Sequence, residues 1–380
     1  MGGVLSGPRG FVPPPYPYDR LVELREACAR HDGGVVDCSV GTPCDPAAPE
    51  VLDAMATSGA EHGYPTSAGS ESYRTSACEM LARCYHVDVA MSELAACVGT
   101  KEFVASLAGY LKLRDPSRDT VLYPAIAYPT YAVSAQLARC RGVAVAVTDG
   151  RLDLDGIDEA TARRALVLWV NSPSNPTGRL DDLGRAAEFG RRYGVLVCSD
   201  ECYADYTWSE PRATVLQHGS DGVLAVHSLS KRSNLAGVRA GFYAGDAEVV
   251  AYLRLVRQHA GLIVAGPVQA GAAVAWGDDE HVVAQRGRYE HRLAMLRTAL
   301  LAAGLEVPRP EGSFYLWASK EGHDDGWRIA AMLAEAAGLL VSPGELYGED
   351  ARRHVRVAVV QPDERLELAC HRLAAAGTLD

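Results

Sequence analysis

The sequence predicts an α/β protein in which a mostly parallel sheet lies between helices and a second, smaller α/β domain follows. Three observations support this fold class. Short runs that are apolar on both faces alternate with helical patterns, and polar residues gather directly after those runs. After about residue 250 the pattern changes to long helical stretches followed by further strands. A chain of 380 residues is long enough for one large core and one smaller core.

The apolar runs are predicted to be buried strands, because strands covered by helices on both sides are apolar on both faces. They are TVLYP (120–124), ALVLWVN (165–171), VLVCSDE (195–201), VLAVHS (223–228) and AGFYAG (240–245). Helical patterns separate or precede them at TSACEMLARCY (75–85), EFVASLAGYL (102–111), TYAVSAQLARC (130–140) and DLGRAAEFGRRYG (182–194). The repeated order of strand and helix favours parallel strands joined by right-handed crossovers.

The C-terminal part is predicted to form the smaller domain. Two long helical stretches, 246–261 and 288–304, precede strands at EGSFYLWAS (311–319) and RHVRVAVV (353–360). We expect the N-terminal segment to join this domain. The predicted division is therefore a large domain over residues 45–270, and a small domain that combines residues 271–380 with residues 1–44, which include a Pro-rich N-terminal arm.

Composition and charge exclude several classes of function. The net charge of −11 argues against a nucleic-acid-binding surface, because a phosphate backbone requires a basic face. No apolar run reaches the roughly 18 residues of a membrane span, and the N-terminus lacks a secretory signal, so we expect a cytoplasmic protein without membrane contact. The ten cysteines lack CxxC spacing and the histidines show no HExxH pattern, so no metal site is expected. No GxGxxG follows the first strand, which disfavours a dinucleotide site.

Polar residues follow the predicted strands, and in parallel sheets ligands bind outside the carboxyl ends of the strands. Alone, each residue has an ordinary structural interpretation as a helix cap, a turn, a packing residue or a surface charge. Together, in one order, they predict a single site. They are Gly99-Thr100-Lys101 at the start of a helix, Tyr128, Asn175 in NPTG, Asp200 and Tyr203 in SDECY, Ser228, Ser230 and Lys231 in HSLSK, and Arg239.

The chemistry of this set suits an aromatic aldehyde that carries a phosphate. Lys231 can form a Schiff base with an aldehyde, provided that desolvation or a nearby cation such as Arg239 lowers its pKa. Ser228, Arg239 and the backbone N–H groups of Thr100 and Lys101, at a helix N-terminus, would form a phosphate cradle.

The remaining residues suit a pyridine ring. Asp200 would keep the ring nitrogen protonated and so make the ring an electron sink. Asn175 and Tyr203 would hydrogen-bond the ring hydroxyl, Tyr128 would stack on the ring face, and Ser230 would complete the cofactor contacts. The cofactor expected from these residues is pyridoxal 5′-phosphate.

These residues also carry a resemblance. From SVGTP (39–43) to HVRVAVV (354–360), the chain resembles pyridoxal-phosphate enzymes of fold type I in the class I and II aminotransferase superfamily. The segments GYPTSAG, WVNSPSNPTGR and AVHSLSKRSNLAGVRAGF are similar in sequence to those of actinobacterial N-succinyldiaminopimelate aminotransferases. The resemblance implies a seven-stranded central sheet and small-molecule amino acid and keto acid substrates.

The resemblance also implies roles for residues outside the strand ends. Arg356 in HVRVA would bind the substrate α-carboxylate as a bidentate fork, with help from Gly41 and Asn175. Tyr64 in GYPTSAG resembles a tyrosine that reaches the cofactor phosphate of a partner subunit. We therefore expect a homodimer with shared active sites.

The resemblance implies amino transfer, with glutamate as donor and a keto acid or aldehyde as acceptor. A second reaction class stays open: elimination, replacement, carbon–carbon bond formation or cyclisation on the same scaffold. Three features depart from the family pattern, namely Cys44 after SVGTP, the opening of EGSFYLW and the Pro-rich arm. By resemblance alone, six residues are candidates for the substrate pocket: Cys44, Tyr16, Tyr18, Arg232, Phe314 and Glu345.

Overall fold

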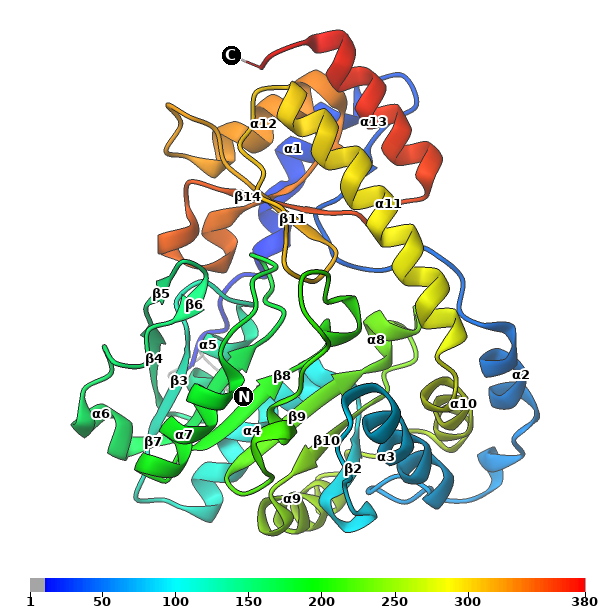
Figure 1. Ribbon diagram of the computed structural model, residues 1–380, viewed down its shortest axis with the longest axis vertical. Coiled ribbons are helices and arrows are strands. Elements are labelled where there is room, and N and C mark those ends of the chain that lie inside the picture. Colours follow the sequence, from blue (N-terminus) through cyan, green and yellow to red (C-terminus); the bar gives the residue numbers. More distant parts are fainter. Residues whose placement is uncertain (1–10, 380) are drawn as a thin grey trace, which may run out of the picture.

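The structure is a computed structural model, and it describes residues 11–379. The first ten residues of the predicted N-terminal arm and the last residue of the chain lie outside this range. A large central sheet with helices on both faces occupies one half of the molecule, and a small sheet with its own helices occupies the other (Figure 1).

The central sheet has seven strands in the order β2-β10-β9-β8-β7-β3-β4, and only β10 runs antiparallel to its neighbours. This confirms the predicted mostly parallel seven-stranded sheet. The five runs predicted from the sequence all form strands of it, while β2 and β4 were not identified in advance. The strands are β2 (Leu94–Cys97), β3 (Thr120–Pro124), β4 (Arg141–Val145), β7 (Ala165–Asn171), β8 (Leu196–Asp200), β9 (Val223–Ser228) and β10 (Gly241–Gly245).

Two hydrophobic cores cover the two faces of the central sheet. Every residue of β7, β8 and β9 is buried, and alternate side chains point to opposite cores: Trp169 to one, Leu168 and Val170 to the other. The first core contains α4 (Thr100–Arg114), α5 (Thr130–Leu137) and α9 (Ala247–His259). The second contains α2 (Pro49–Thr57), α3 (Glu71–Tyr85), α6 (Glu159–Arg164), α7 (Leu183–Tyr193) and α10 (Gly266–Gly277).

Local sequence signals explain where several of these helices begin and end. The side chains of Ser70 and Asp182 accept backbone N–H groups at the first turns of α3 and α7. Gly194 ends α7 in the left-handed conformation, with φ 64°.

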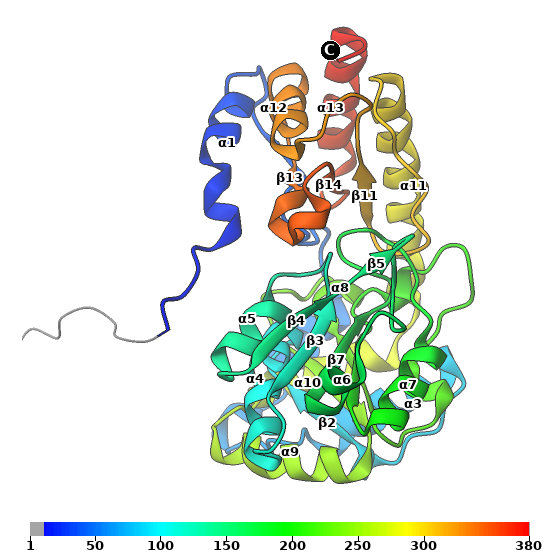
Figure 2. The same cartoon turned by 90° about the vertical axis from the view of Figure 1, so that its left-hand side faces the viewer.

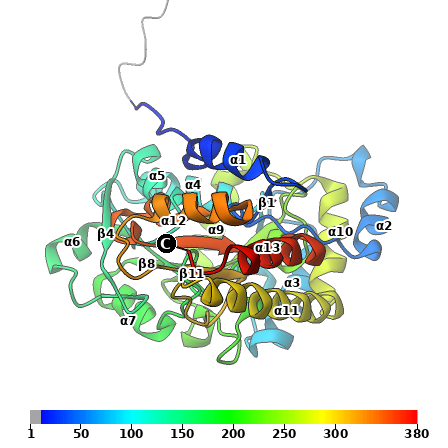
Figure 3. The ribbon, with the colours of Figure 1, turned by 90° about the horizontal axis from the view of Figure 1, so that it is seen from above.

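The second half of the molecule is built on a three-stranded antiparallel sheet, β11-β14-β13, which lies above the central sheet in Figure 2. Helices α1, α12, α13 and α11 lie side by side over it (Figure 3). The bounds are β11 (Tyr315–Ala318), β13 (Ser342–Pro343), β14 (Val355–Ala358), α1 (Val22–Ala29), α11 (Glu280–Ala302), α12 (Gly326–Ala337) and α13 (Asp363–Ala376).

The N-terminal segment contacts this second half. Strand β1 (Val36–Asp37) pairs in parallel with β12 (Leu339–Leu340), and α1 packs against α12. The remaining strands form the short hairpin of β5 (Val147–Thr148) with β6 (Arg151–Leu152), and the remaining α-helix is the one-turn α8 (Leu229–Arg232). None of the described helices combines the length and the apolar character that a membrane span requires. Residues 11–379 contain no group of three or more His, Cys, Asp or Glu side chains placed to bind a metal ion.

Candidate active site

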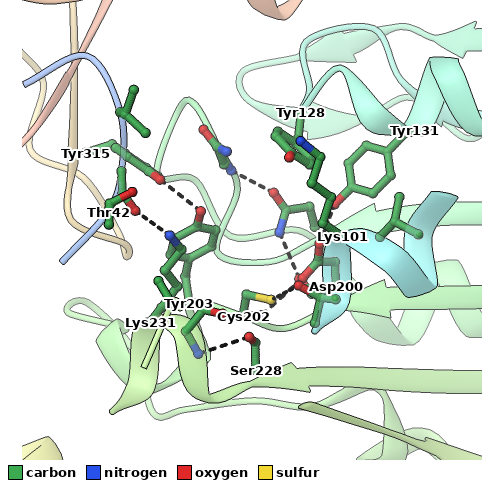
Figure 4. A pocket seen from close by; sticks show the side chains of 18 of the residues that line it. Thr42, Lys101, Tyr128, Tyr131, Asp200, Cys202, Tyr203, Ser228, Lys231 and Tyr315 are labelled. Carbon is green, nitrogen blue, oxygen red and sulfur yellow. Dashed lines mark hydrogen bonds between the residues drawn. The ribbon is translucent and has the colours of Figure 1, made fainter. Parts of the chain in front are cut away.

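A cavity of about 360 Å³ lies at the carboxyl ends of the parallel strands. Twelve of the residues predicted to bind cofactor or substrate line it, whereas Tyr64 and Gly99 do not. The twelve are Gly41, Thr100, Lys101, Tyr128, Asn175, Asp200, Tyr203, Ser228, Ser230, Lys231, Arg239 and Arg356. In Figure 4, Lys231 and Tyr203 lie on one side of the cavity, and Tyr128 and Tyr131 lie on the other.

Secondary structure accounts for this convergence. Asn171, Asp200 and Ser228 are the last residues of three neighbouring strands, and Asn171 is paired in register with Asp200. Lys231 follows in α8, and Thr100 begins α4. Because the carboxyl ends of parallel strands meet at one edge of the sheet, these side chains are brought to the same opening.

Lys231 is an amine in a desolvated position. Its Nζ donates a hydrogen bond to the carbonyl oxygen of Gly41. Burial lowers the pKa of Lys231 from 10.5 to about 8, and the positive charges of Arg356 and Arg239 act in the same direction. The sequence predicted that desolvation or a nearby cation such as Arg239 would lower this pKa; burial is the largest cause, and Arg356 is a further cation that the sequence did not indicate. A lysine with this pKa is substantially neutral near pH 8 and can act as a nucleophile or a base.

We expect the pH dependence of this amine to be visible in the apoprotein. Only the neutral amine attacks an aldehyde, so the rate at which pyridoxal 5′-phosphate becomes attached should rise with pH and level off above about 8. Stopped-flow absorbance between pH 6 and 10 measures this rate, with that range chosen to bracket the expected midpoint by about two units each way. A midpoint near 10.5, the ordinary value for lysine, would contradict the buried environment.

Asp200 is a buried carboxyl group with two donors. The hydroxyl of Tyr131 donates to Asp200 Oδ2 at 2.8 Å, and the backbone N–H of Cys202 donates to Oδ1 at 3.3 Å. Burial raises the pKa of the Asp200 carboxyl, and the bonds from Cys202 and Tyr131 oppose this rise. A buried carboxylate is stabilised by a cationic partner, so a protonated pyridine nitrogen fits this position.

A second part of the cavity has the character of an anion site. The N–H groups of Thr100 and Lys101, at the start of α4, have no acceptor among the described residues. Arg239 Nη1 donates to Ser230 Oγ at 3.3 Å and to the carbonyl oxygen of Ala236 at 2.8 Å.

Gly99 lets these donors approach one another. It has φ +75°, and a Cβ at this residue would lie 2.2 Å from Arg239 Nη2. The helix N-terminus and the guanidinium therefore face the same small space, which fits a phosphate group.

Arg356 forms the third part of the site. It is 1% exposed, and its guanidinium lies 4.2 Å from the ring centroid of Tyr315. Nη1 donates to Asn175 Oδ1 at 2.8 Å and Nη2 donates to the carbonyl oxygen of Ser39 at 2.5 Å. Nε has no hydrogen-bond partner among the described residues. A buried guanidinium that lines a cavity and keeps a donor without a partner among the described residues fits a carboxylate ligand.

The model of the family described as aminotransferase class I and II matches residues 34–373. The chain belongs to this family. The enzymes of this family depend on pyridoxal 5′-phosphate, and the lysine, the carboxyl group and the anion site described above fit that cofactor.

Two curated relatives are similar to this aminotransferase over 95% of its chain. The probable aminotransferase Rv1178 of Mycobacterium tuberculosis is 42% identical over 371 residues, 85% of its own length. The 4-dedimethylamino-4-oxo-anhydrotetracycline transaminase OxyQ of Streptomyces rimosus is 42% identical over 369 residues, 99% of its length. A solved N-succinyldiaminopimelate aminotransferase from Mycobacterium tuberculosis superimposes with a TM-score of 0.84 at 26% identity, covering 94% of this chain and 97% of that one.

Sequence reasoning missed several residues of the aminotransferase site. Tyr131, Asn171, Cys202 and Tyr315 all line the cavity. The hydroxyls of Tyr203 and Tyr315 lie 2.9 Å apart, so a residue of the small sheet fixes the position of the Tyr203 side chain. One signal for Tyr131 was available, because YPTY places it three residues after Tyr128, and the two rings lie edge to face with their centroids 6.2 Å apart.

We expect the Tyr131→Phe variant to lower kcat by about tenfold with little change in KM, because the bond it removes supports the charged form of Asp200. Steady-state kinetics of amino transfer measure both constants. The matched control is Tyr252→Phe, which removes a tyrosine hydroxyl bonded to the carbonyl oxygen of Tyr110 in α4 rather than to a cavity residue. Equal losses in the two variants would contradict a specific role for Tyr131.

Of the six further candidates for the substrate pocket, only Tyr16 and Tyr18 line the cavity. The prediction was wrong for the other four. Arg232 is buried in ion pairs with Asp205 and Asp279 and does not line the cavity that Lys231 lines. The others are held elsewhere as follows: Phe314 in the hydrophobic core, Glu345 in an ion pair with Arg20, and Cys44 beside Arg292.

Tyr64 lies outside the cavity of the single chain. Its side chain is fully exposed. The expected contact with a partner subunit remains a prediction.

Proposed function

We propose that this aminotransferase takes the amino group of an α-amino acid, with glutamate as donor, and transfers it to the carbonyl carbon of a second substrate. The observation that carries the proposal is that the buried guanidinium of Arg356 and the amine of Lys231 line the same cavity, and that Arg356 Nε has no hydrogen-bond partner among the described residues. A donor whose α-carboxylate pairs with Arg356 would have its amino group and α-hydrogen held within the reach of one cavity.

The residues divide the work as follows. When bound, pyridoxal 5′-phosphate accepts the amino group and withdraws electrons from the α-carbon. Lys231 removes the α-proton of the donor and later returns a proton, because its lowered pKa suits both directions of transfer. Arg356 orients the carboxylate, and Asp200 keeps the proton on the ring nitrogen. The overall reaction converts an amino acid and a carbonyl compound into a keto acid and an amine.

The acceptor is proposed only as a class. One relative is named for 4-dedimethylamino-4-oxo-anhydrotetracycline and a structural neighbour for N-succinyldiaminopimelate, so a keto acid, an aldehyde or a ring ketone all suit the proposal. The homodimer with Tyr64 at a shared site, the division at residues 45–270, and the cytoplasmic location belong to the same proposal.

The test is a titration of the purified protein with L-glutamate while its visible absorbance is recorded and 2-oxoglutarate is assayed. We expect the absorbance of the aldehyde form of the cofactor to be lost with one equivalent of 2-oxoglutarate per site, and to return when 2-oxoglutarate is added in excess. The alternative reaction class predicts another result: glutamate has no effect, and a different amino acid loses a side-chain group without forming 2-oxoglutarate.

A further inference from the structure

An ion pair between a buried arginine and a partly exposed glutamate includes a residue of the helix turn that forms the proposed phosphate site. Arg257, near the end of α9, donates from Nη1 to Glu102 Oε1 at 2.9 Å and from Nη2 to Glu102 Oε2 at 2.6 Å. The Arg257 side chain is 1% exposed. Glu102 lies in the first turn of α4, two residues after Thr100.

The carboxylate of Glu102 is turned away from the free N–H groups of that turn. Besides Arg257, it accepts from Ser106 Oγ at 2.9 Å and from the backbone N–H of Val98 at 3.3 Å, which precedes the helix. Thr100 and Lys101 therefore keep their N–H groups for an external anion, although a carboxylate stands within the same turn.

The charge of Glu102 matters to any anion bound there. A carboxylate in the first turn of a helix competes with a bound phosphate for the positive end of the helix dipole, and it repels the phosphate. Arg257 cancels this charge through its two hydrogen bonds to the carboxylate. Its position is set by packing, because its guanidinium lies 5.4 Å and 5.6 Å from the ring centroids of Phe103 and Tyr243.

The Arg257–Glu102 ion pair is not expected to stabilise the fold more than apolar residues would. Replacing a buried ion pair with apolar residues of similar volume is often neutral or stabilising, whereas removing one partner leaves an uncompensated charge. We propose that Arg257 is a positioning residue that acts through Glu102, and that it keeps the first turn of α4 able to bind the phosphate of the cofactor. This inference rests on the proposed placement of the phosphate.

The experiment compares two ligands that differ only in the phosphate. Apoprotein is titrated with pyridoxal 5′-phosphate and with pyridoxal, and the ratio of the two dissociation constants is the readout. We expect Arg257→Met to reduce the preference for the phosphorylated ligand by about tenfold or more, with the affinity for pyridoxal nearly unchanged. Should this variant not fold, Arg257→Gln, which keeps a neutral donor beside Glu102, is measured instead with the same expected direction.

Two further variants separate the explanations. The double variant Glu102→Gln/Arg257→Met removes the uncompensated carboxylate together with its partner, so we expect it to recover most of the preference. The control is Arg292→Met, which breaks another buried pair, with Asp45 and Asp363, away from α4. It should lower thermal stability and leave the ratio unchanged.

Each failure has its own meaning. If the unmodified protein binds pyridoxal as tightly as pyridoxal 5′-phosphate, the proposed placement of the phosphate is wrong, and the inference about Arg257 is wrong as well. If the unmodified protein prefers the phosphorylated ligand and the Arg257 variant keeps that preference, only the inference is wrong. An equal loss of affinity for both ligands would show a merely structural role and would also overturn it.

Discussion

Replacing Lys231 with alanine will lower kcat for amino transfer by at least about 10⁴-fold, because the variant loses both the amine that binds the aldehyde and the base that moves the α-proton. The structure supports both uses, since Lys231 lines the cavity and burial lowers its pKa to about 8. Steady-state assays with glutamate as donor measure the loss.

The control for this variant is Lys320→Ala, which changes a lysine that does not line the cavity. We expect it to keep the activity of the unmodified protein. Residual turnover in Lys231→Ala above about one part in 10³ of the unmodified rate would exceed what positioning and binding by the other residues explain. Such a result would mean that another side chain acts as the base.

The second large effect is expected at Arg356. The Arg356→Leu variant should raise KM for glutamate by about 100-fold, because a charge-assisted pair with the α-carboxylate is lost in a buried site. A donor without a carboxylate, such as benzylamine, should react at nearly the same low rate in both proteins. The comparison of kcat/KM for the two donors is the measurement.

A matched variant tests whether charge or geometry matters at this residue. Arg356→Lys keeps the charge and loses the fork that bonds Asn175 and Ser39, so we expect partial recovery for glutamate. The assignment of Arg356 to the carboxylate would be contradicted if glutamate and benzylamine lost activity equally in Arg356→Leu.

The parts of the fold that follow local rules were predicted from the sequence. Buried parallel strands are recognised because they are apolar on both faces, and ligand residues are found because they follow those strands directly. Asp200 ends the buried strand β8, and Lys231 lies shortly after the buried strand β9. Strand β4 was missed because most of its residues are not buried, so it lacks the apolar run that marks β7.

The contacts made between distant segments could not be predicted. Tyr315 meets Tyr203 across the two sheets, and nothing in either local sequence indicates that their hydroxyls pair. The environment of Lys231 could not be predicted for the same reason, because the effect of Arg356 on the pKa of Lys231 depends on how the small sheet lies over the large one. Arg232 was predicted to line the pocket by resemblance alone, whereas its guanidinium forms ion pairs with Asp205 and Asp279.

Borohydride trapping tests the central claim most directly. The chain has four lysines, Lys101, Lys112, Lys231 and Lys320, and the first and third line the cavity. Reduction of the purified protein with bound pyridoxal 5′-phosphate, followed by peptide mass analysis, should place the pyridoxyl label on the peptide that contains Lys231. Label on Lys101 instead, or no labelled lysine after the cofactor is supplied, would contradict the assignment of this cavity as the active site built around Lys231.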